Sequence, residues 1–143
     1  MAVLASKPFP WQCSNCGKGE VRPSIAPYRL KVRHDGAMHA VEVPSLRAPK
    51  CSACGNIVFD REEDEQVNAA VRAALGLMPP DEIRRGREAL GLEAGQLAER
   101  LGVQARTLEQ WERGAILQPR AADRLLRVYF AVPEARAFLQ GAA

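Results

Sequence analysis

Four cysteines arranged in two short pairs restrict the fold of this chain more than any other feature of the sequence. The 143-residue sequence contains no other cysteine, and in each pair two residues separate the thiols and a glycine follows. Two thiolates at this spacing bind one metal ion within a tight turn, and the glycine lets the backbone bend. Two such pairs supply the complete donor set of a tetrahedral site. The sequence therefore predicts one structural Zn²⁺ ion bound by Cys13, Cys16, Cys51 and Cys54.

Three other uses of four cysteines compete with zinc. Disulfides require an oxidising compartment, whereas residues 1–10 lack the apolar centre of a secretory signal. A thioredoxin-like pair requires a βαβ context, which the sequence does not indicate. An iron–sulfur cluster is chemically compatible with four thiolates, but the spacing favours zinc. Because four thiolates leave no ligand position for water or substrate, the predicted site is structural rather than catalytic.

The segment between the cysteine pairs has the pattern of a β-hairpin. Residues 28–33 and 39–43 alternate between apolar and polar side chains, and Asp35-Gly36 is a strong signal for a two-residue turn. We expect Leu30, Val32, Val41 and Val43 to share the buried face. His34 and His39 flank the turn, and we expect both to be solvated because the cysteines already satisfy the metal.

A helix and a short linker are predicted after the second cysteine pair. Asp60 and Glu63 form the pattern of a capping box, and Val67, Val71 and Leu75 recur at helical spacing. Residues 76–80 end in two prolines and break the helix. We therefore expect a flexible tail at 1–10, a zinc-binding domain at 11–75, a linker at 76–80 and a helical domain at 81–143. The predicted fold class is α+β.

Residues 92–114 predict two short helices joined by a tight turn. The first spans about 94–101 and ends at Gly102, and the second spans about 105–113 and ends at Gly114. Leu108 and Trp111 are expected to point inward, which leaves the polar side chains of the second helix outside. This is helix-turn-helix geometry, in which the second helix enters the DNA major groove. An αα-hairpin without a nucleic-acid role has the same periodicity.

Three further helices complete the predicted five-helix domain. One spans 81–90; another starts near Pro119, with Ala122, Leu125, Leu126 and Tyr129 facing the core. The last starts at Pro133 and carries Phe138 and Leu139, which can pack within the same subunit or against a second subunit.

Composition adds few constraints. The net charge of +3 is mild, and every basic residue after position 71 is an arginine, which suits bidentate contacts to phosphate and guanine. No apolar run reaches the roughly 18 residues that a membrane span needs, so a cytoplasmic protein without membrane contact is expected. The sequence contains no carboxylate pair, nucleophile–base set or phosphate-binding glycine loop, and we expect no enzymatic activity.

The sequences LAERLGV and TLEQWERG, at residues 97–103 and 107–114, resemble the Cro/lambda-repressor-type (XRE) helix-turn-helix family. Four positions depart from the family pattern. Glu93-Ala94 stands where the family often has Thr-Gln, so a glutamine that often touches the DNA backbone in the family is absent. Glu93 and Gln104 replace better N-cap residues, so the N-termini of both helices are expected to be weakly capped. Gly86 stands where a larger apolar residue is usual, and it should cost about 1 kcal/mol relative to alanine. Weak caps favour binding as a dimer, in which two half-sites add their contributions.

Nearly the whole chain resembles the MqsA-type antitoxins, also called YgiT-type zinc finger proteins. The resemblance lies in the order of its parts: the cysteine pairs, the capped helix, the proline linker and the helix-turn-helix. The resemblance implies that the zinc domain docks a cognate ribonuclease toxin. It also implies that the helical domain forms a homodimer, binds a palindromic operator in double-stranded DNA and represses its own operon. The four cysteines match the zinc ligands of the family.

The same resemblance assigns candidate DNA contacts. The base-reading positions of the family fall on Arg106 and Gln110, which can pair with guanine and adenine respectively, although Arg106 can equally contact phosphate. The further candidates are Gln104, Ala105, Glu109, Arg113, Arg120 and Arg124. The alternative function is a zinc-ribbon and XRE transcription regulator without a toxin, similar to the multiprotein-bridging factors.

Overall fold

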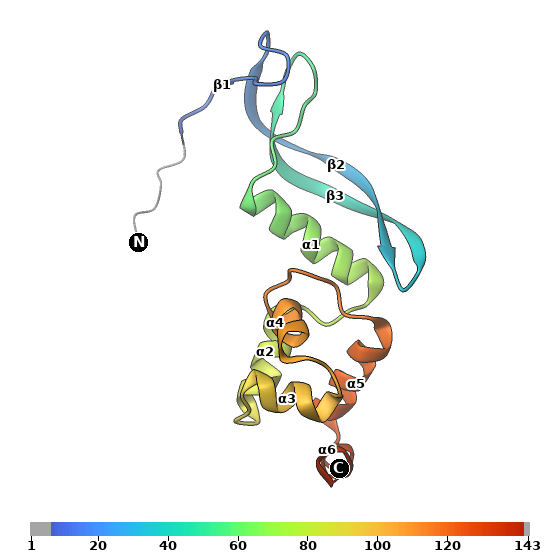
Figure 1. Cartoon of the computed structure of the whole chain (residues 1–143). Coiled ribbons are helices and arrows are strands. Elements are labelled where there is room, and N and C mark those ends of the chain that lie inside the picture. Colours follow the sequence, from blue (N-terminus) through green and yellow to red (C-terminus); the bar gives the residue numbers. More distant parts are fainter. Residues whose placement is uncertain (1–6, 142–143) are drawn as a thin grey trace. The chain divides into compact units, whose positions relative to one another are not determined.

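The computed structural model describes residues 7–141, so the first six residues of the expected tail at 1–10 lie outside the described residues. A small sheet precedes a series of helices, which confirms the α+β class (Figure 1). The elements are β1 (Trp11–Gln12), β2 (Glu20–His34), β3 (Ala37–Cys51), α1 (Arg61–Leu75), α2 (Pro80–Ala89), α3 (Ala94–Leu101), α4 (Ala105–Glu112), α5 (Arg120–Ala131) and α6 (Pro133–Gly141). No helix within these described residues is long and apolar enough to span a membrane.

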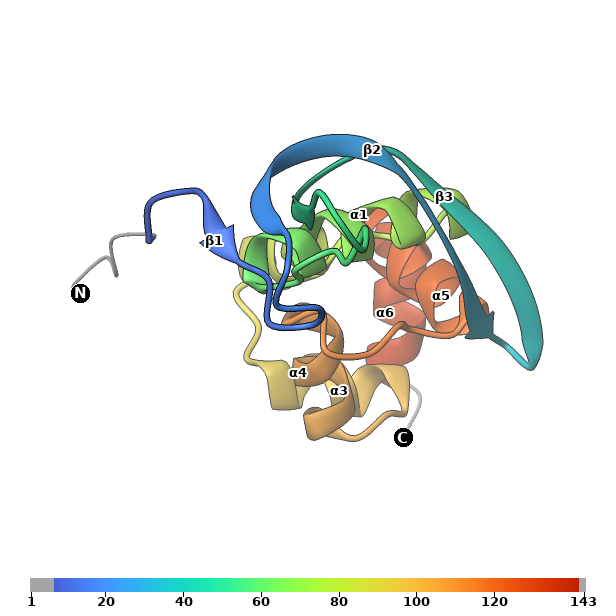
Figure 2. The same cartoon turned by 90° about the horizontal axis from the view of Figure 1, so that it is seen from above.

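The sheet has the strand order β1-β2-β3, and β1 pairs antiparallel with the start of β2. Between β2 and β3, Asp35 and Gly36 have φ values of 51° and 79°, which is the left-handed backbone of a two-residue hairpin turn. Figure 2 shows β2 and β3 side by side along a curved ribbon. Each strand has 15 residues and is longer than the alternation predicted. Pro23 and Pro27 interrupt the alternation in β2. Both follow Glu20 and Val21, the residues of β2 that pair with β1, so neither proline removes a hydrogen bond to that strand.

The chain divides into two compact units. The first, called the metal unit here, contains the chain up to Leu30 together with Ala40–Ala70. The second, called the helical unit, contains Lys31–His39 and the chain from Val71 onward. β2, β3 and α1 therefore each contribute residues to both units. In the segment 76–80, where the sequence indicates a linker, Leu77 and Met78 are buried, and Met78 belongs to the core of the helical unit.

Two small apolar clusters form the core of the metal unit. The first contains Cys13, Val21 and Cys51, and the second contains Val43, Leu46 and Ala48 with partly buried residues around them. One half of the predicted capping box at the start of α1 is present, since the Asp60 N–H donates to Glu63 Oε2 at 3.0 Å. The Asp60 side chain accepts the N–H of Arg61 at 2.8 Å. Further along α1, the Gln66 carboxamide accepts a hydrogen bond from the Arg47 N–H and donates one to the Arg47 carbonyl. This clamp attaches α1 to β3.

The helical unit has one larger core, to which every helix from α2 to α6 contributes. Its fully or nearly fully buried members are Met78, Ile83, Leu97, Ala98, Leu108, Trp111, Leu126 and Tyr129. The inward positions predicted for the helix-turn-helix are therefore confirmed. In α6, Leu139 packs against this core, whereas Phe138 is 75% exposed.

The prediction that the N-terminus of α3 is weakly capped is wrong. Glu93 and Gln96 form a capping box, in which the Glu93 N–H donates to Gln96 Oε1 at 2.8 Å. Glutamine at the third helical position therefore compensates for the poor N-cap residue. At the start of α4, in contrast, the Gln104 side chain makes no capping hydrogen bond, as expected.

The cost predicted for Gly86 is also wrong, because this glycine lies against an aromatic ring. A Cβ atom added at Gly86 would stand 2.7 Å from two ring carbons of Phe130. We expect Gly86→Ala to destabilise the helical unit by about 1 kcal/mol, because overpacking outweighs the gain in helix propensity. Gly95→Ala is the matched control, since no atom lies within 4 Å of its added Cβ. Urea denaturation should show that Gly95→Ala leaves stability unchanged or raises it; equal stabilisation by both substitutions would contradict the steric argument.

Candidate functional site

The four cysteine sulfurs converge in the metal unit. The Sγ atoms of Cys13 and Cys54 are 3.7 Å apart, those of Cys16 and Cys51 are 3.8 Å apart, and all four lie within 4.8 Å of one another. A tetrahedral site with Zn–S bonds of about 2.3 Å has sulfur–sulfur distances of about 3.8 Å. The donor set is four thiols that form no disulfide. The site therefore fits one structural Zn²⁺ ion.

Glycines shape the two turns that present the sulfurs. Gly17 and Gly55 have φ values of 68° and 74°, and their N–H groups donate to the carbonyls of Cys13 and Cys51 at 2.9 and 3.1 Å. The predicted role of the glycine after each pair is confirmed. Gly19 is a further functional residue that the cysteine spacing does not predict, because a Cβ atom there would collide with Cys51 Sγ. Its proximity to the first pair was the only signal for this close approach.

Hydrogen bonds favour the thiolate form that a metal requires at Cys54 and Cys13. At Cys51 the backbone N–H of Cys54 acts in the same direction, but burial and the neighbouring thiols raise the pKa overall. The Asn15 side chain donates to Cys54 Sγ at 3.5 Å, and this contact is the main cause that lowers the pKa of Cys54 to about 6. The pKa of Cys13 is also lowered, chiefly by the backbone N–H of Cys16. The turns thus orient donors toward the sulfurs as well as placing the sulfurs together.

In the helical unit, α3 and α4 form the predicted helix-turn-helix. α3 ends at Gly102 with a φ of 75°, and α4 follows after a short turn. Leu108 and Trp111 are buried on the inner side of α4, while Arg106 is exposed and Gln110 is partly exposed. Since residues four apart share a helix face, Arg106 and Gln110 lie on the same side. Gln104, Ala105 and Glu109 are exposed as well.

The arginine candidates differ in their surroundings. Arg106, Arg113 and Arg124 are exposed and form no ion pair with any residue between 7 and 141. The Arg120 side chain donates instead to the Leu75 carbonyl, and its backbone N–H donates to Asp35. Arg120 is therefore already engaged within the helical unit.

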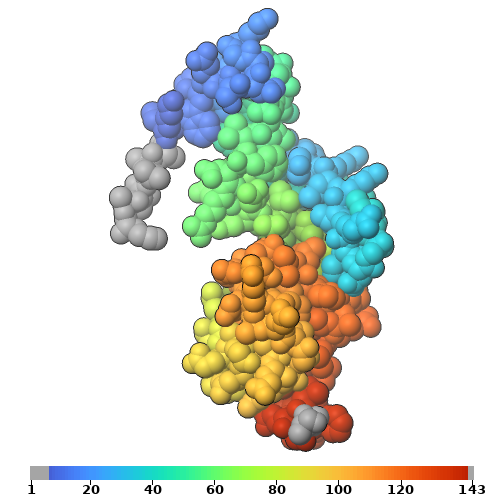
Figure 3. Space-filling view, in the orientation of Figure 1, coloured from blue at the N-terminus to red at the C-terminus, as the bar shows by residue number. Residues whose placement is uncertain are grey.

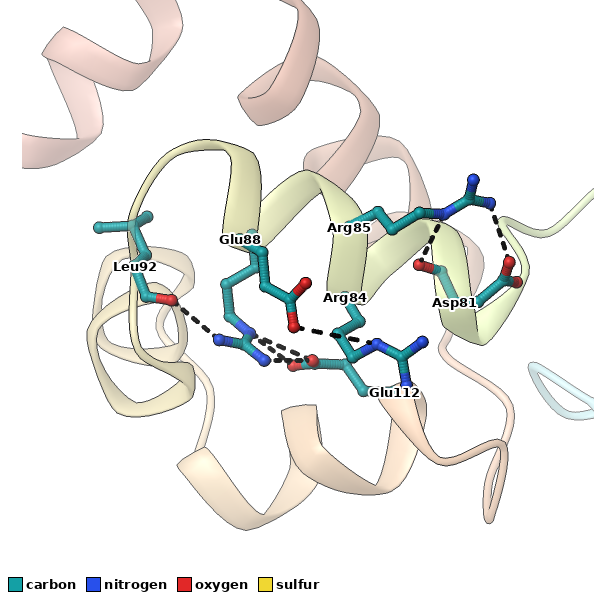
Figure 4. Close-up of polar contacts among 7 residues, drawn as sticks. Asp81, Arg84, Arg85, Glu88, Leu92 and Glu112 are labelled. Carbon is teal, nitrogen blue, oxygen red and sulfur yellow. Dashed lines mark hydrogen bonds and ion pairs between the residues drawn. The ribbon is translucent and has the colours of Figure 1, made fainter.

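A buried ion pair attaches α4 to α2 (Figure 4). Arg87 Nη2 and Glu112 Oε1 are 2.8 Å apart, and the side chains are only 15% and 7% exposed. Arg87 Nη1 also donates to the Leu92 carbonyl before α3, at 2.8 Å. The Glu112 carboxylate raises the pKa of Arg87. The sequence gives only one signal for this pair, which is that Glu112 lies four residues after the inward-facing Leu108.

A four-cysteine metal centre and a helix-turn-helix in one chain define the class of zinc-finger helix-turn-helix proteins. A family model described as the antitoxin component of a bacterial toxin-antitoxin system, MqsA, matches residues 11–137. The chain belongs to this antitoxin family. The match covers both units and confirms the resemblance that the sequence indicated. No curated protein matches the chain at a significant level.

Proposed function

We propose that this antitoxin is also a DNA-binding autorepressor. In this proposal, the helix-turn-helix binds a palindromic operator as a homodimer, and the metal unit docks and neutralises a ribonuclease toxin. The main support is the exposed face of α4, on which Arg106 and Gln110 lie opposite the buried Leu108 and Trp111. In helix-turn-helix proteins this face of the second helix enters the major groove.

The residue types on α4 fit base recognition. An arginine can donate two hydrogen bonds to guanine, and a glutamine can pair with adenine. Glu109, also exposed, can accept a hydrogen bond from cytosine. Arg113 and Arg124 carry free positive charges in the same unit and are the candidates for phosphate contacts.

We expect Arg106→Ala to weaken binding to the specific operator by about 1–3 kcal/mol, with little change on random DNA. The reason is that a base contact contributes only where the correct base is present. Fluorescence anisotropy on both DNAs at one fixed salt concentration measures the difference. Arg84→Ala, an exposed arginine on α2, is the control and should bind both DNAs like the parent. Equal losses on both DNAs would assign Arg106 to the phosphate backbone instead.

Exposed apolar side chains support a homodimer formed through the helical unit. Val128 and Val132, at the end of α5 and just beyond it, are 44% and 39% exposed, and Phe138 on α6 is 75% exposed. Large apolar side chains that remain in water often mark a protein interface. A dimer would present two copies of α4, as a palindromic operator requires.

The proposed toxin is tested with the native operon. The product of a neighbouring gene for a small ribonuclease should co-purify with this protein, and footprinting of the upstream DNA should show two symmetric half-sites. Loss of ribonuclease activity in the complex would support neutralisation. Protection of the DNA without any bound ribonuclease would favour the alternative of a zinc-ribbon regulator that has no toxin.

A further inference from the structure

The tip of the β2–β3 hairpin, Lys31–His39, belongs to the helical unit rather than to the metal unit. Figure 3 shows this tip, in cyan, against the orange segment that leads into α5. His34 was expected to be solvated, but its side chain is buried with only 6% of the residue exposed. The expectation is wrong because sequence alternation describes a hairpin alone and does not reveal what packs on its tip.

Asp35 supplies the N-terminal cap that α5 lacks. The N-cap residue of α5 is Pro119, whose side chain cannot accept a hydrogen bond. Asp35 Oδ2 instead accepts the N–H of Arg120, the first residue of α5, at 3.0 Å. A carboxylate at this position satisfies one of the free N–H groups of the first turn and complements the positive end of the helix dipole.

A second contact connects the tip to the core of the helical unit. His34 Nε2 is 2.9 Å from the Gln118 carbonyl, and because a carbonyl only accepts, this nitrogen carries the proton. The buried Gln118 side chain donates to the Met78 carbonyl and to Asp123 Oδ1. Asp123 Oδ1 also accepts the Met78 N–H at 2.7 Å. The hairpin tip thus adjoins a buried hydrogen-bond network that holds the loop before α5.

The same hairpin ends at the metal centre. β3 runs from Ala37, directly after the turn, to Cys51, which is one of the four clustered cysteines. β2 begins at Glu20, shortly after Cys16. The strand pairing that brings Asp35 to α5 therefore depends on strands whose other ends are attached to the cysteine cluster.

We propose that Asp35 is a positioning residue for α5, through which metal binding at the cysteines controls the stability of the helical unit. When the metal is bound, the paired strands hold the turn against α5. When it is removed, the strands lose their attachment and the cap is lost with them. The inference does not depend on DNA binding or on a toxin.

The test follows thermal unfolding of the full chain by the fluorescence of Trp111, which lies in the core of the helical unit at 2% exposure. The second tryptophan is removed by Trp11→Phe, and one bound zinc per chain is verified by elemental analysis. Asp35→Gly deletes the carboxylate but suits the φ of 51° at this position, so the turn is preserved. Asp35→Asn keeps an acceptor oxygen without the charge. Arg33→Gln is the control, an exposed hairpin residue.

Asp35→Gly should lower the Trp111 midpoint by about 4–8 °C, the shift that loss of one helix cap produces in a unit of this size. Asp35→Asn should lower it by less, and Arg33→Gln should leave it unchanged. Chelation should lower the Trp111 midpoint of the parent by at least as much as the Asp35→Gly substitution does. In the Asp35→Gly variant, chelation should lower the midpoint much less than it does in the parent. Two results would overturn the proposal: an unchanged midpoint in Asp35→Gly, or an equal chelation shift in the parent and in Asp35→Gly.

Discussion

Removal of the zinc ion is expected to unfold the metal unit and to leave the helical unit folded. Cys13 and Cys51 are themselves part of the small cluster around Val21, and the second cluster of this unit, formed by Val43, Leu46 and Ala48, is equally small. Cores of this size rarely keep so short a segment folded without a metal. Structural zinc contributes roughly 10–16 kcal/mol in zinc-finger peptides, which exceeds the whole stability of many small domains. The core of the helical unit, around Ile83 and Leu126, contains no cysteine and should survive.

Two-dimensional NMR during titration with a chelator distinguishes the two units. Amide signals of the metal unit should collapse to the narrow range of an unfolded chain, while those of α2 to α6 remain dispersed. Cys51→Ser should reproduce this state without a chelator. Ser14→Ala, an exposed position within the first cysteine pair, should retain both zinc and structure. A single cooperative loss of all signals would show that the two units do not fold separately.

The local features of the sequence were sufficient to predict much of this structure. The spacing of the cysteines predicted the cluster, Asp35-Gly36 predicted the hairpin turn, and the glycines at 102 and 114 predicted the ends of the two central helices. Each of these signals acts over a few residues. The residue types within a single turn are therefore enough to predict each of these features.

Two of the errors concern contacts between segments that are distant in the sequence, whereas the error at the start of α3 is local, since Gln96 lies three residues after Glu93. Gly86 faces Phe130, and His34 contacts Gln118. Neither partner is implied by the periodicity of its own element, because a hydrophobic pattern tells which face is buried but not which side chain covers it. The strands were predicted too short for a different reason, since the prediction rested on the alternation at residues 28–33 and 39–43, whereas the strands extend beyond it to Glu20 and Cys51.

The largest expected effect in the helical unit comes from Glu112→Ala. This substitution leaves the Arg87 guanidinium buried beside α4 with the Leu92 carbonyl as its remaining described partner. Removing one partner of a buried ion pair costs about 3–5 kcal/mol, because the other charge stays desolvated. Urea denaturation followed by Trp111 fluorescence should show a loss near the lower end of this range, since Arg87 retains some exposure to water.

The neighbouring pair on α2 provides the control. Arg84 and Glu88 are 4.0 Å apart and more than half exposed, so Glu88→Ala should cost less than about 0.5 kcal/mol. A double variant, Arg87→Met with Glu112→Leu, separates the two possible causes of the loss. If the desolvated charge is responsible, the double variant should be more stable than Glu112→Ala, because it removes both charges and keeps the volume. If the double variant is equally unstable, the hydrogen bonds from Arg87 Nε and Nη2 to the Glu112 carboxylate themselves hold α4 on α2. The orientation of the proposed DNA-reading face would then depend on them.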